Sequence, residues 1–477
     1  MRPGRALPLL QKRLAERETA LLGLVRNLIF EQPSGPYRDL MAVAGIECGD
    51  VEHLVTDLGV EGALEALQRA GVYLTVEEFK GRRAIVRGST TIRGDPSTLA
   101  NPLAGAHIRS QTSGSRGGRT PVAVDVGHIG DRLVDFALIL HARGGTQWQN
   151  ALWSVPGGAA LINLLLFAGL GAPPVRWFSQ IDPRRSSLDW RYRWSPRVVR
   201  AMAGIAGVAL PLPEHVPARA PLEVASWMAA VLRRGGTPHL YAYTSAAVAL
   251  CEAAGATGLP LAGAQFTVTG EPLTERRLAV MRATGASVST NYGTNECGGF
   301  IGYGCLAPEH PDEVHLLDDL HAVVQVHGGA GVPDGALLVS SLRQTAPLVL
   351  LNVSLGDQAA MARRECGCSL QALGWRTHLH TIRSFEKLTA GGISLLAADV
   401  VRILEEVLPE RFGGGPASYQ VVEEAFLDAL GTRSGGERVA QLVWRESGFL
   451  GVERREPART PSGKVNHVQV RPATDHA

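Results

Sequence analysis

The sequence carries almost no excess charge of either sign, few cysteines and no long apolar run. Its 47 Lys and Arg residues nearly balance 45 Asp and Glu residues, which gives a net charge of +2. Such a balance supplies no global field that would draw nucleic acid or an anionic membrane to the chain, so we expect neither as a partner. The most apolar window, residues 159–172, contains Asn163 and is too short to span a bilayer.

The N-terminus has no pattern of a secretory signal. It is charged at Arg2, Arg5, Lys12 and Arg13, and no apolar stretch of signal length follows. We therefore expect a cytoplasmic protein, in which the six cysteines are reduced thiols or metal ligands and not disulfides.

The length and the periodicity predict an α/β protein of more than one domain. A chain of 477 residues exceeds what one core usually supports. Strand and helix patterns alternate over residues 238–291, which predicts a layered, largely parallel α/β sheet, and glycine turns between short strands at 323–351 predict a β-rich subdomain. A glycine break beyond Arg383 predicts a large N-terminal domain, residues 1–383, and a small α+β domain, residues 384–477.

A glycine-rich segment, residues 110–121, combines hydroxyl side chains, glycines and two arginines and lacks large apolar residues. Glycines let successive backbone N–H groups converge on an anion, and hydroxyls and arginines add donors, so the segment suits a polyphosphate. The β-prone residues on both sides predict a strand–loop–strand hairpin. The alternative is a flexible surface turn.

Three later segments carry further candidate chemistry. Tyr292 can stack on a purine and Glu296 can hold magnesium, although a capped turn with an exposed Glu gives the same pattern. Asp357, which we expect at the end of a strand, can accept hydrogen bonds from ribose hydroxyls, or it belongs to a plain Gly-Asp turn. Lys464 follows a Ser-Gly turn, where its ammonium could stabilise a phosphoryl transition state or simply be solvated in a frayed tail.

The order and spacing of these segments resemble the adenylate-forming enzymes, which include acyl-CoA synthetases, adenylation domains and luciferases. The phenylacetate–CoA ligase branch and the coenzyme F390 synthetases fit best. The resemblance runs from about Ala106 to the C-terminus and implies a mobile C-terminal domain that carries the catalytic lysine.

The resemblance also implies a role for each matching residue. The loop over the ATP phosphates would contain Thr112, Ser113, Gly114, Ser115, Arg116 and Gly117. Gly270 and Glu271 would line the adenine and acyl pocket. The adenine-side turn would contain Tyr292, Gly293 and Thr294, with Glu296 as the magnesium ligand. Asp357 would bind the ribose hydroxyls with help from Arg383, and Lys464 would bridge acyl and phosphate oxygens.

Several positions depart from the family pattern. Arg116 stands where a threonine is usual, Arg119 replaces a proline, and Asn295 replaces the threonine before the glutamate. In the hinge region only Glu386 is acidic, and the lysine expected near Thr389 is missing. The adenylate-forming half-reaction therefore matches the family better than the thioester-forming half.

The cysteines give a separate signal. Cys366 and Cys368 form a Cys-x-Cys pair, and Cys305 lies upstream, near His310 and His315. Three thiols and one imidazole can bind zinc in a tetrahedral site. We choose His315 over His310 as the imidazole ligand because we expect His315 to lie in a strand. Reduced, unliganded thiols are the alternative.

The predicted function is that of an AMP-forming ligase that uses ATP and Mg²⁺ to activate a small-molecule carboxylic acid as an acyl-adenylate. Coenzyme A is the expected acceptor, and an amine, a hydroxyl or a carrier-protein thiol is the alternative. A catalytically silent nucleotide-binding relative is a further alternative. The sequence indicates neither the acid nor the oligomeric state.

One basic and aromatic stretch, residues 176–197, stands outside this scheme. Arginines alternate there with tryptophans and a tyrosine, which can stack nucleobases. Because the flanking sequence has no basic excess, we favour a surface excursion whose aromatic side chains fold back onto the core.

Overall fold

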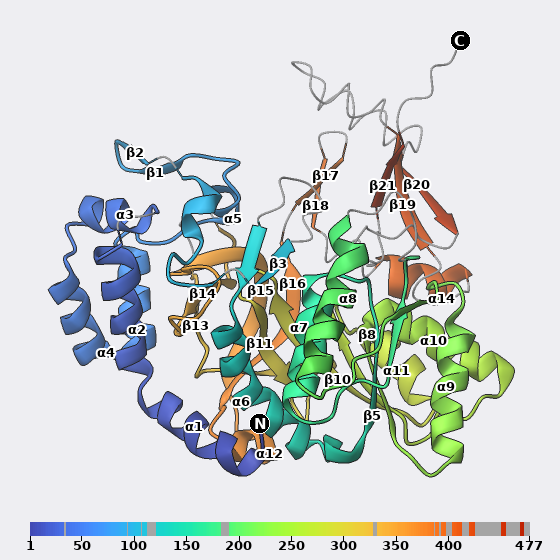
Figure 1. The fold of residues 1–477 in the computed structure, drawn as a ribbon. Coiled ribbons are helices and arrows are strands. Elements are labelled where there is room, and N and C mark those ends of the chain that lie inside the picture. Colours follow the sequence, from blue (N-terminus) through green and yellow to red (C-terminus); the bar gives the residue numbers. More distant parts are fainter. Residues whose placement is uncertain are drawn as a thin grey trace.

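The computed structural model shows a mixed α/β protein built on a twelve-stranded sheet (Figure 1). The structure describes residues 1–32, 35–92, 94–105, 107–111, 121–182, 190–327, 332–385, 387–390, 393–396, 403–412, 419–424, 450–454 and 468–471. The strand order in the large sheet is β13-β14-β15-β16-β12-β11-β10-β9-β8-β5-β6-β7. The predicted α/β class is therefore confirmed.

One half of the sheet is parallel. Its strands are β5 (Gln149–Trp153), β6 (Arg176–Ser179), β7 (Pro213–His215), β8 (Pro238–Tyr243), β9 (Gln265–Thr269) and β10 (Ser287–Thr294). In β5, Ala151 and Trp153 belong to one hydrophobic core and Leu152 to the other, so both faces of the strand are covered. That burial explains why the strand reads as an apolar run without alternation.

Helices cover both faces of this half. The core on one face includes α9 (Pro221–Arg233), α10 (Thr244–Thr257) and α11 (Glu275–Arg282). The core on the other face includes α6 (Val126–Ala142) and α7 (Gly158–Gly169). Helix α8 (Trp190–Ile205) follows β6 and is drawn on the near side of the molecule in Figure 1. Helices α10 and α11 lie in the stretch 238–291, where the sequence predicts alternating strands and helices.

The other half of the sheet is antiparallel from β10 outward. Its strands are β11 (Gly299–Gly304), β12 (Val314–Leu316), β13 (His321–Gln325), β14 (Ala336–Ser341), β15 (Val353–Arg363) and β16 (Thr377–Ser384). Strand β16 lies between β15 and β12, and the short helix α12 (Ser369–Ala372) stands in the connection that leads to it. This half is the β-rich region that the sequence predicts.

An N-terminal group of helices packs on the antiparallel half. It contains α1 (Pro3–Ala15), α2 (Arg17–Val25), α3 (Tyr37–Ala44), α4 (Cys48–Arg69) and α5 (Val76–Phe79). Strands β1 (Ile85–Arg87) and β2 (Thr90–Ile92) form a separate hairpin. Helices α1 and α2 are separated at Glu16, and α4 is kinked at Gly59, whose φ is +71°.

The glycine-rich segment connects two paired strands. Strands β3 (Ile108–Gln111) and β4 (Pro121–Val124) are antiparallel, with Gln111 opposite Pro121. The predicted strand–loop–strand hairpin is therefore confirmed, while residues 112–120 lie outside the described part of the chain. Figure 1 places the hairpin near β15 and α7.

The strands that follow β16 belong to other sheets. Strands β17 (Lys387–Ala390) and β18 (Ile393–Leu396) form a hairpin, and β20 (Leu450–Arg454), β19 (Tyr419–Glu424) and β21 (Val468–Arg471) form a three-stranded sheet. The described residues between them include α14 (Leu408–Phe412). The large sheet ends at Ser384, and the division into domains 1–383 and 384–477 stays a prediction.

A buried polar network stands inside the fold between α6, α1 and the start of β13. Arg132, Asp135 and Asp319 are each no more than 3% exposed. Asp319 accepts a hydrogen bond from Trp375 Nε1 at 3.0 Å and lies 3.6 Å from the Arg13 guanidinium. Burial and the neighbouring charge of Asp319 raise the pKa of Asp135 well above its usual value. The two carboxyl groups are therefore best accommodated when Asp135 keeps its proton and donates it to Asp319.

This arrangement makes the stability of the protein depend on pH. Folding raises the pKa of Asp135, so above about pH 4 the unfolded chain has lost this proton while the folded chain still holds it. The free energy of unfolding therefore falls as pH rises, by up to about 1.4 kcal/mol per pH unit. Asp135→Asn keeps a donor toward Asp319 and removes the titration. We expect its stability relative to the wild type to improve from pH 4 toward pH 7, as measured by urea unfolding at each pH.

Asp57→Asn is the matched control, since Asp57 is exposed on α4 and its replacement should change the unfolding free energy little at any pH. A difference between Asp135→Asn and the wild type that stays constant with pH would contradict the shared proton.

Candidate functional site

The carboxyl ends of three neighbouring parallel strands, β8, β9 and β10, meet at one edge of the sheet. Strands β8, β9 and β10 are parallel neighbours, with Tyr243 opposite Thr269 and Val268 opposite Thr290. Their carboxyl ends therefore lie side by side, where α/β proteins bind ligands. At these ends lie Gly270, Glu271 and Tyr292, which the family resemblance assigned to the nucleotide and acyl pocket.

Gly270 and Glu271 make the turn after β9. Gly270 has φ +78°, a conformation that favours glycine. The Glu271 carboxylate accepts hydrogen bonds from Ser245 N at 2.7 Å and Ser245 Oγ at 3.0 Å, so it caps the N-terminus of α10. It also lies 3.5 Å from Arg277 Nη1, and Arg277 is buried. Glu271 thus has structural partners in addition to any contact with a ligand.

The turn between β10 and β11 contains the predicted magnesium ligand. A Cβ on Gly293 would lie 2.3 Å from the Gly299 carbonyl oxygen, so only glycine fits at the start of this tight hairpin. The turn rests on α6, because His128 Nε2 lies 3.3 Å from the Gly298 carbonyl oxygen. Thr294 closes the turn by accepting the Cys297 N–H at 3.3 Å, and Glu296 is half-buried within it. Glu296 is therefore held by a turn with a fixed backbone.

Tyr292 and Asp357 are brought together from distant parts of the chain. Tyr292 Oη donates a hydrogen bond to Asp357 Oδ2 at 2.9 Å. In strand order β10 and β15 are separated by β11, β12 and β16, and neighbouring strands lie about 4.8 Å apart. A flat sheet would hold the two residues beyond the reach of a tyrosine, so the antiparallel half must curve until β15 faces β10.

The structure places Asp357 and Arg383 differently from what the sequence led us to expect. Asp357 does not end a strand, as the sequence suggested: β15 continues to Arg363, because Gly356 with φ +96° is accommodated inside it. In the β15–β16 register, Asp357 stands opposite Ser384 and the exposed Arg383 opposite Gln358. Since side chains alternate between faces, the register directs Arg383 and Asp357 to opposite faces of the strand pair.

The remaining predicted residues lie outside the described part of the chain. They are Thr112, Ser113, Gly114, Ser115, Arg116 and Gly117 of the glycine-rich loop, and Lys464 and Glu386 of the C-terminal region. The described strands β3 and β4 fix where the loop begins and ends, and the loop itself stays a prediction.

The four predicted zinc ligands form one cluster. The ligand atoms of Cys305, His315, Cys366 and Cys368 all lie within 4.8 Å of one another. Cys368 Sγ is 3.2 Å and Cys366 Sγ 3.7 Å from His315 Nε2. Cys305 follows β11, His315 lies in β12, and the Cys-x-Cys pair lies between β15 and α12, so the fold brings three separate segments to one point.

The contacts around the cluster prepare His315 as a ligand. His315 Nδ1 donates to the Trp375 carbonyl oxygen at 2.8 Å, which leaves Nε2 unprotonated and directed at the thiols. Burial, followed by the charge of His378, lowers the pKa of His315 to about 4, so its ring is neutral at pH 7. His310 instead stacks on His380 at 4.0 Å and is absent from the candidate metal groups of the described residues.

The surroundings of the thiols support a charged cluster. The Ala307 N–H donates to Cys305 Sγ at 3.4 Å, and Arg364 Nη2 lies 3.8 Å from the same sulfur. Arg364 also pairs with Glu313, and Glu313 is 2.6 Å from His378 Nδ1. Burial raises the pKa of Cys305, which a bound cation would counteract. The donor set and its neighbours therefore fit a structural zinc ion.

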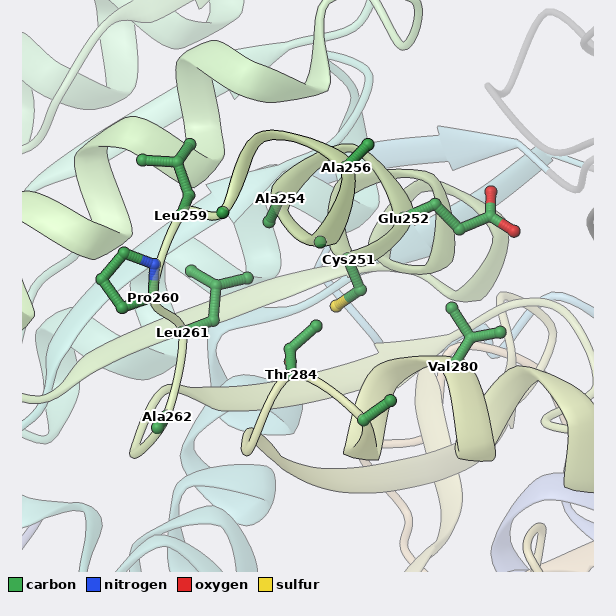
Figure 2. A pocket seen from close by; sticks show the side chains of 13 residues that line it. Cys251, Glu252, Ala254, Ala256, Leu259, Pro260, Leu261, Ala262, Val280 and Thr284 are labelled. Carbon is green, nitrogen blue, oxygen red and sulfur yellow. The ribbon is translucent and has the colours of Figure 1, made fainter.

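A shallow cavity of about 520 Å³ lies elsewhere (Figure 2). Its lining includes Cys251, Glu252, Leu259, Pro260 and Thr284. These residues come from the C-terminal part of α10 and from the connections that lead into the amino ends of β9 and β10, the opposite edge from Gly270. Burial raises the pKa of the Cys251 thiol to about 12, which leaves it unreactive at pH 7. The cavity is separate from the candidate site.

Sequence reasoning missed the polar network beneath the site. Arg132 and Asp135 interrupt the apolar face of α6, and that interruption in an otherwise apolar run was the available signal. Asp319 and Glu313, by contrast, stand in ordinary-looking turns, where nothing in the sequence distinguishes them from solvated acids.

Known proteins give few points of comparison. The chain matches no protein-family model and no curated protein. Among the helices of the described residues, none combines the length and apolarity needed to cross a membrane.

Several solved structures align with the chain at low identity and with low TM-scores. One is a 2-hydroxyisobutyryl-CoA ligase in complex with 2-HIB-AMP and CoA, which is 15% identical to this chain. The aligned part covers 97% of this chain and 89% of the ligase chain, with a TM-score of 0.48. A malonyl-CoA ligase complex with methylmalonyl-CoA and AMP is 15% identical, with coverages of 92% and 93% and a TM-score of 0.39. The O-succinylbenzoate coenzyme A synthetase from Bacillus subtilis is 13% identical, with coverages of 79% and 74% and a TM-score of 0.38. Similarity at this level indicates no activity by itself.

The position of Glu271 predicts a stability effect that a residue serving a ligand alone would not have. Glu271→Ala leaves Ser245 N and the buried Arg277 without their carboxylate, so we expect a loss of about 3 kcal/mol or more in unfolding free energy. Glu271→Gln keeps an acceptor and should lose about half as much. Urea unfolding measures both, and Ser245→Ala, which removes one hydroxyl, is the smaller reference change. An alanine variant as stable as the wild type would refute the capping role.

Proposed function

We propose that this protein is an AMP-forming, carboxylate-activating ligase, most similar in its motifs to phenylacetate–CoA ligases. In the proposed reaction a carboxylic acid and ATP form an acyl-adenylate, and coenzyme A then accepts the acyl group. The observation that carries the proposal is the hydrogen bond between Tyr292 and Asp357, two residues assigned to one nucleotide from separate motifs.

The geometry around that hydrogen bond supports a nucleotide site. Tyr292 lies near the end of β10 and Glu296 in the turn that follows it, while Asp357 comes from β15 and Gly270 from the turn after β9. An aromatic ring beside a carboxylate provides a stacking surface for adenine and an acceptor for vicinal ribose hydroxyls. Burial and the adjacent Asp357 raise the pKa of Tyr292 well above its usual value, so the phenol stays protonated and remains a donor.

The proposed first step joins the acid to the α-phosphate. A carboxylate oxygen forms a bond to the α-phosphorus while the bond from that phosphorus to the bridging oxygen breaks, and pyrophosphate leaves with the electron pair. Residues 112–120 would hold the phosphates, Glu296 would hold Mg²⁺, and the Lys464 ammonium would neutralise charge on the reacting oxygens. Each of these assignments rests on the sequence resemblance.

The proposed second step transfers the acyl group. The thiol of coenzyme A gives up its proton and attacks the acyl carbon, and the bond from that carbon to the phosphate oxygen breaks to release AMP. In this proposal the domain of residues 384–477 rotates about the segment after Arg383 between the two steps, as such closures commonly do. The unusual hinge sequence makes an amine, a hydroxyl or a carrier-protein thiol the alternative acceptor.

We further propose a structural zinc ion held by Cys305, His315, Cys366 and Cys368. A closed set of four protein ligands leaves no position for substrate, so the ion would serve the fold. The ligands come from the end of β11, from β12 and from the segment before α12, and they would fix the end of the curved half-sheet that carries Asp357.

The adenylation step is tested by acid-dependent exchange of labelled pyrophosphate into ATP across a panel of acids. Asp357→Ala should weaken ATP binding roughly 10- to 100-fold because charged hydrogen bonds to the ribose are lost. Lys464→Ala should lower the exchange rate roughly 1000-fold while ATP still binds. Mass detection of a thioester after coenzyme A is added then separates the acceptors.

Asp334→Ala is the control, since Asp334 is an exposed surface carboxylate whose removal should change neither quantity. Absence of exchange with every acid, together with retained ATP binding, would favour the catalytically silent alternative. Absence of ATP and AMP binding would reject the nucleotide site.

The zinc proposal predicts about one equivalent of metal per chain by elemental analysis. Cys368→Ser or His315→Ala should lower the zinc content to a small fraction and reduce the melting temperature, because metal binding is coupled to folding. Cys48→Ser and His310→Ala lie outside the cluster and should keep the metal. A wild-type chain without zinc, or a His315→Ala chain that retains it, would contradict the assignment.

A further inference from the structure

Helix α8 presents an apolar stripe to solvent. Four of its side chains are strongly exposed: Trp194 (55%), Val198 (53%), Met202 (67%) and Ile205 (89%). Large apolar side chains of this exposure normally occur singly on a protein surface, and a contiguous group marks an interaction site.

The four residues lie on one face of the helix. With 100° between successive residues, the positions 194, 198, 202 and 205 fall within an arc of about 80°. The exposed Arg197 and Arg200 lie beyond one border of this arc, and the side beyond the other border faces the protein, where Pro196 is buried and Val199 packs on the core. The exposed part of α8 is therefore an apolar stripe with a cationic border.

The charge of α8 restricts what can cover the stripe. The described side chains of α8 include the cations Arg197 and Arg200, and the sequence of the helix contains no acidic residue. A second copy of this chain would bring the same cations against these, which costs affinity. The occupant must therefore be apolar where it meets the stripe and anionic where it meets the arginines.

We propose that α8 docks this protein on a lipid surface that contains anionic head groups. A helix lying in a membrane interface buries its apolar stripe at the acyl boundary and keeps its arginines among the head groups, and Trp194 is of the residue type that favours this depth. A fluid bilayer needs no matching groove, whereas a protein partner must provide one for a single convex helix. A net charge of +2 gives the whole chain little affinity for an anionic lipid surface. In this proposal that affinity comes from the apolar stripe and the arginines of α8.

The exposure of Trp194 corrects part of the sequence-based prediction for residues 176–197. Trp177 in β6 folds onto the core, as expected, and is 1% exposed. Trp194 does not, because it lies on the face of α8 that points away from Val199 and the core. The inference concerns a surface apart from the candidate site and does not depend on the proposed function.

Co-sedimentation of the full chain with vesicles tests the docking. We expect binding to vesicles of phosphatidylcholine mixed with phosphatidylglycerol at low salt, and much weaker binding to phosphatidylcholine alone. The double substitution Met202→Glu with Ile205→Glu should lower partitioning about tenfold or more, since apolar burial is lost and negative charge is added. Arg197→Gln with Arg200→Gln should lower it less and make it less sensitive to salt.

Leu58→Glu with Val86→Glu is the matched control, because both residues are similarly exposed apolar side chains on other elements. Its partitioning should equal that of the wild type. A wild-type chain that remains in the supernatant with anionic vesicles, or a Met202→Glu/Ile205→Glu chain that still binds them, overturns the proposal. Retention on polyglutamate without vesicle binding would assign the stripe to an acidic protein, and a wild-type dimer that the double variant abolishes would assign it to a second copy. Either result also overturns the proposal.

Discussion

The hydrogen bond from Tyr292 to Asp357 is the contact on which the candidate site depends. It joins the last parallel strand to a strand four places away in the sheet, so it can form only if the antiparallel half curves back over β10. The same curvature brings Asp357 close to the turn that contains Glu296, since both carboxylates act on the pKa of Cys297 in that turn. A substitution that flattened this half would separate the candidate groups without touching any of them.

Trp375 connects that curved half to the candidate metal cluster and to the core. Its carbonyl oxygen accepts from His315 Nδ1, and its indole N–H donates to Asp319. Asp319 in turn faces Asp135 and Arg13, which lie on α6 and α1. A side chain that is completely buried thus links the cluster ligands to the helices beneath the Glu296 turn. Trp375 therefore helps to hold in place both the cysteine–histidine cluster and the helices next to the candidate site.

The sequence predicted what local patterns control. Alternation at 238–291 specified β8, α10, β9, α11 and β10 within a few residues, because those elements have strong periodicity. Likewise, the Cys-x-Cys pair together with Cys305 and His315 predicted a metal cluster, and the fold brings these four side chains together. The cap formed by Glu271, the continuation of β15 past Asp357 and the Asp135–Asp319 pair depend on segments far apart in the chain. The interrupted apolar face of α6 was a local sign of buried charge at Asp135, but no local pattern indicates its partner Asp319, the cap at Glu271 or the length of β15.

The position of β16 has a consequence for synthesis of the chain. This strand is the last to enter the large sheet, yet it lies between β15 and β12 and pairs with both. Until the ribosome has released residues 377–384, each of those two strands keeps an edge with unpaired backbone groups, and such edges promote association with other chains. Folding of the curved half must therefore wait for a segment near residue 380, and nascent chains that stop short of it are the ones most exposed to aggregation.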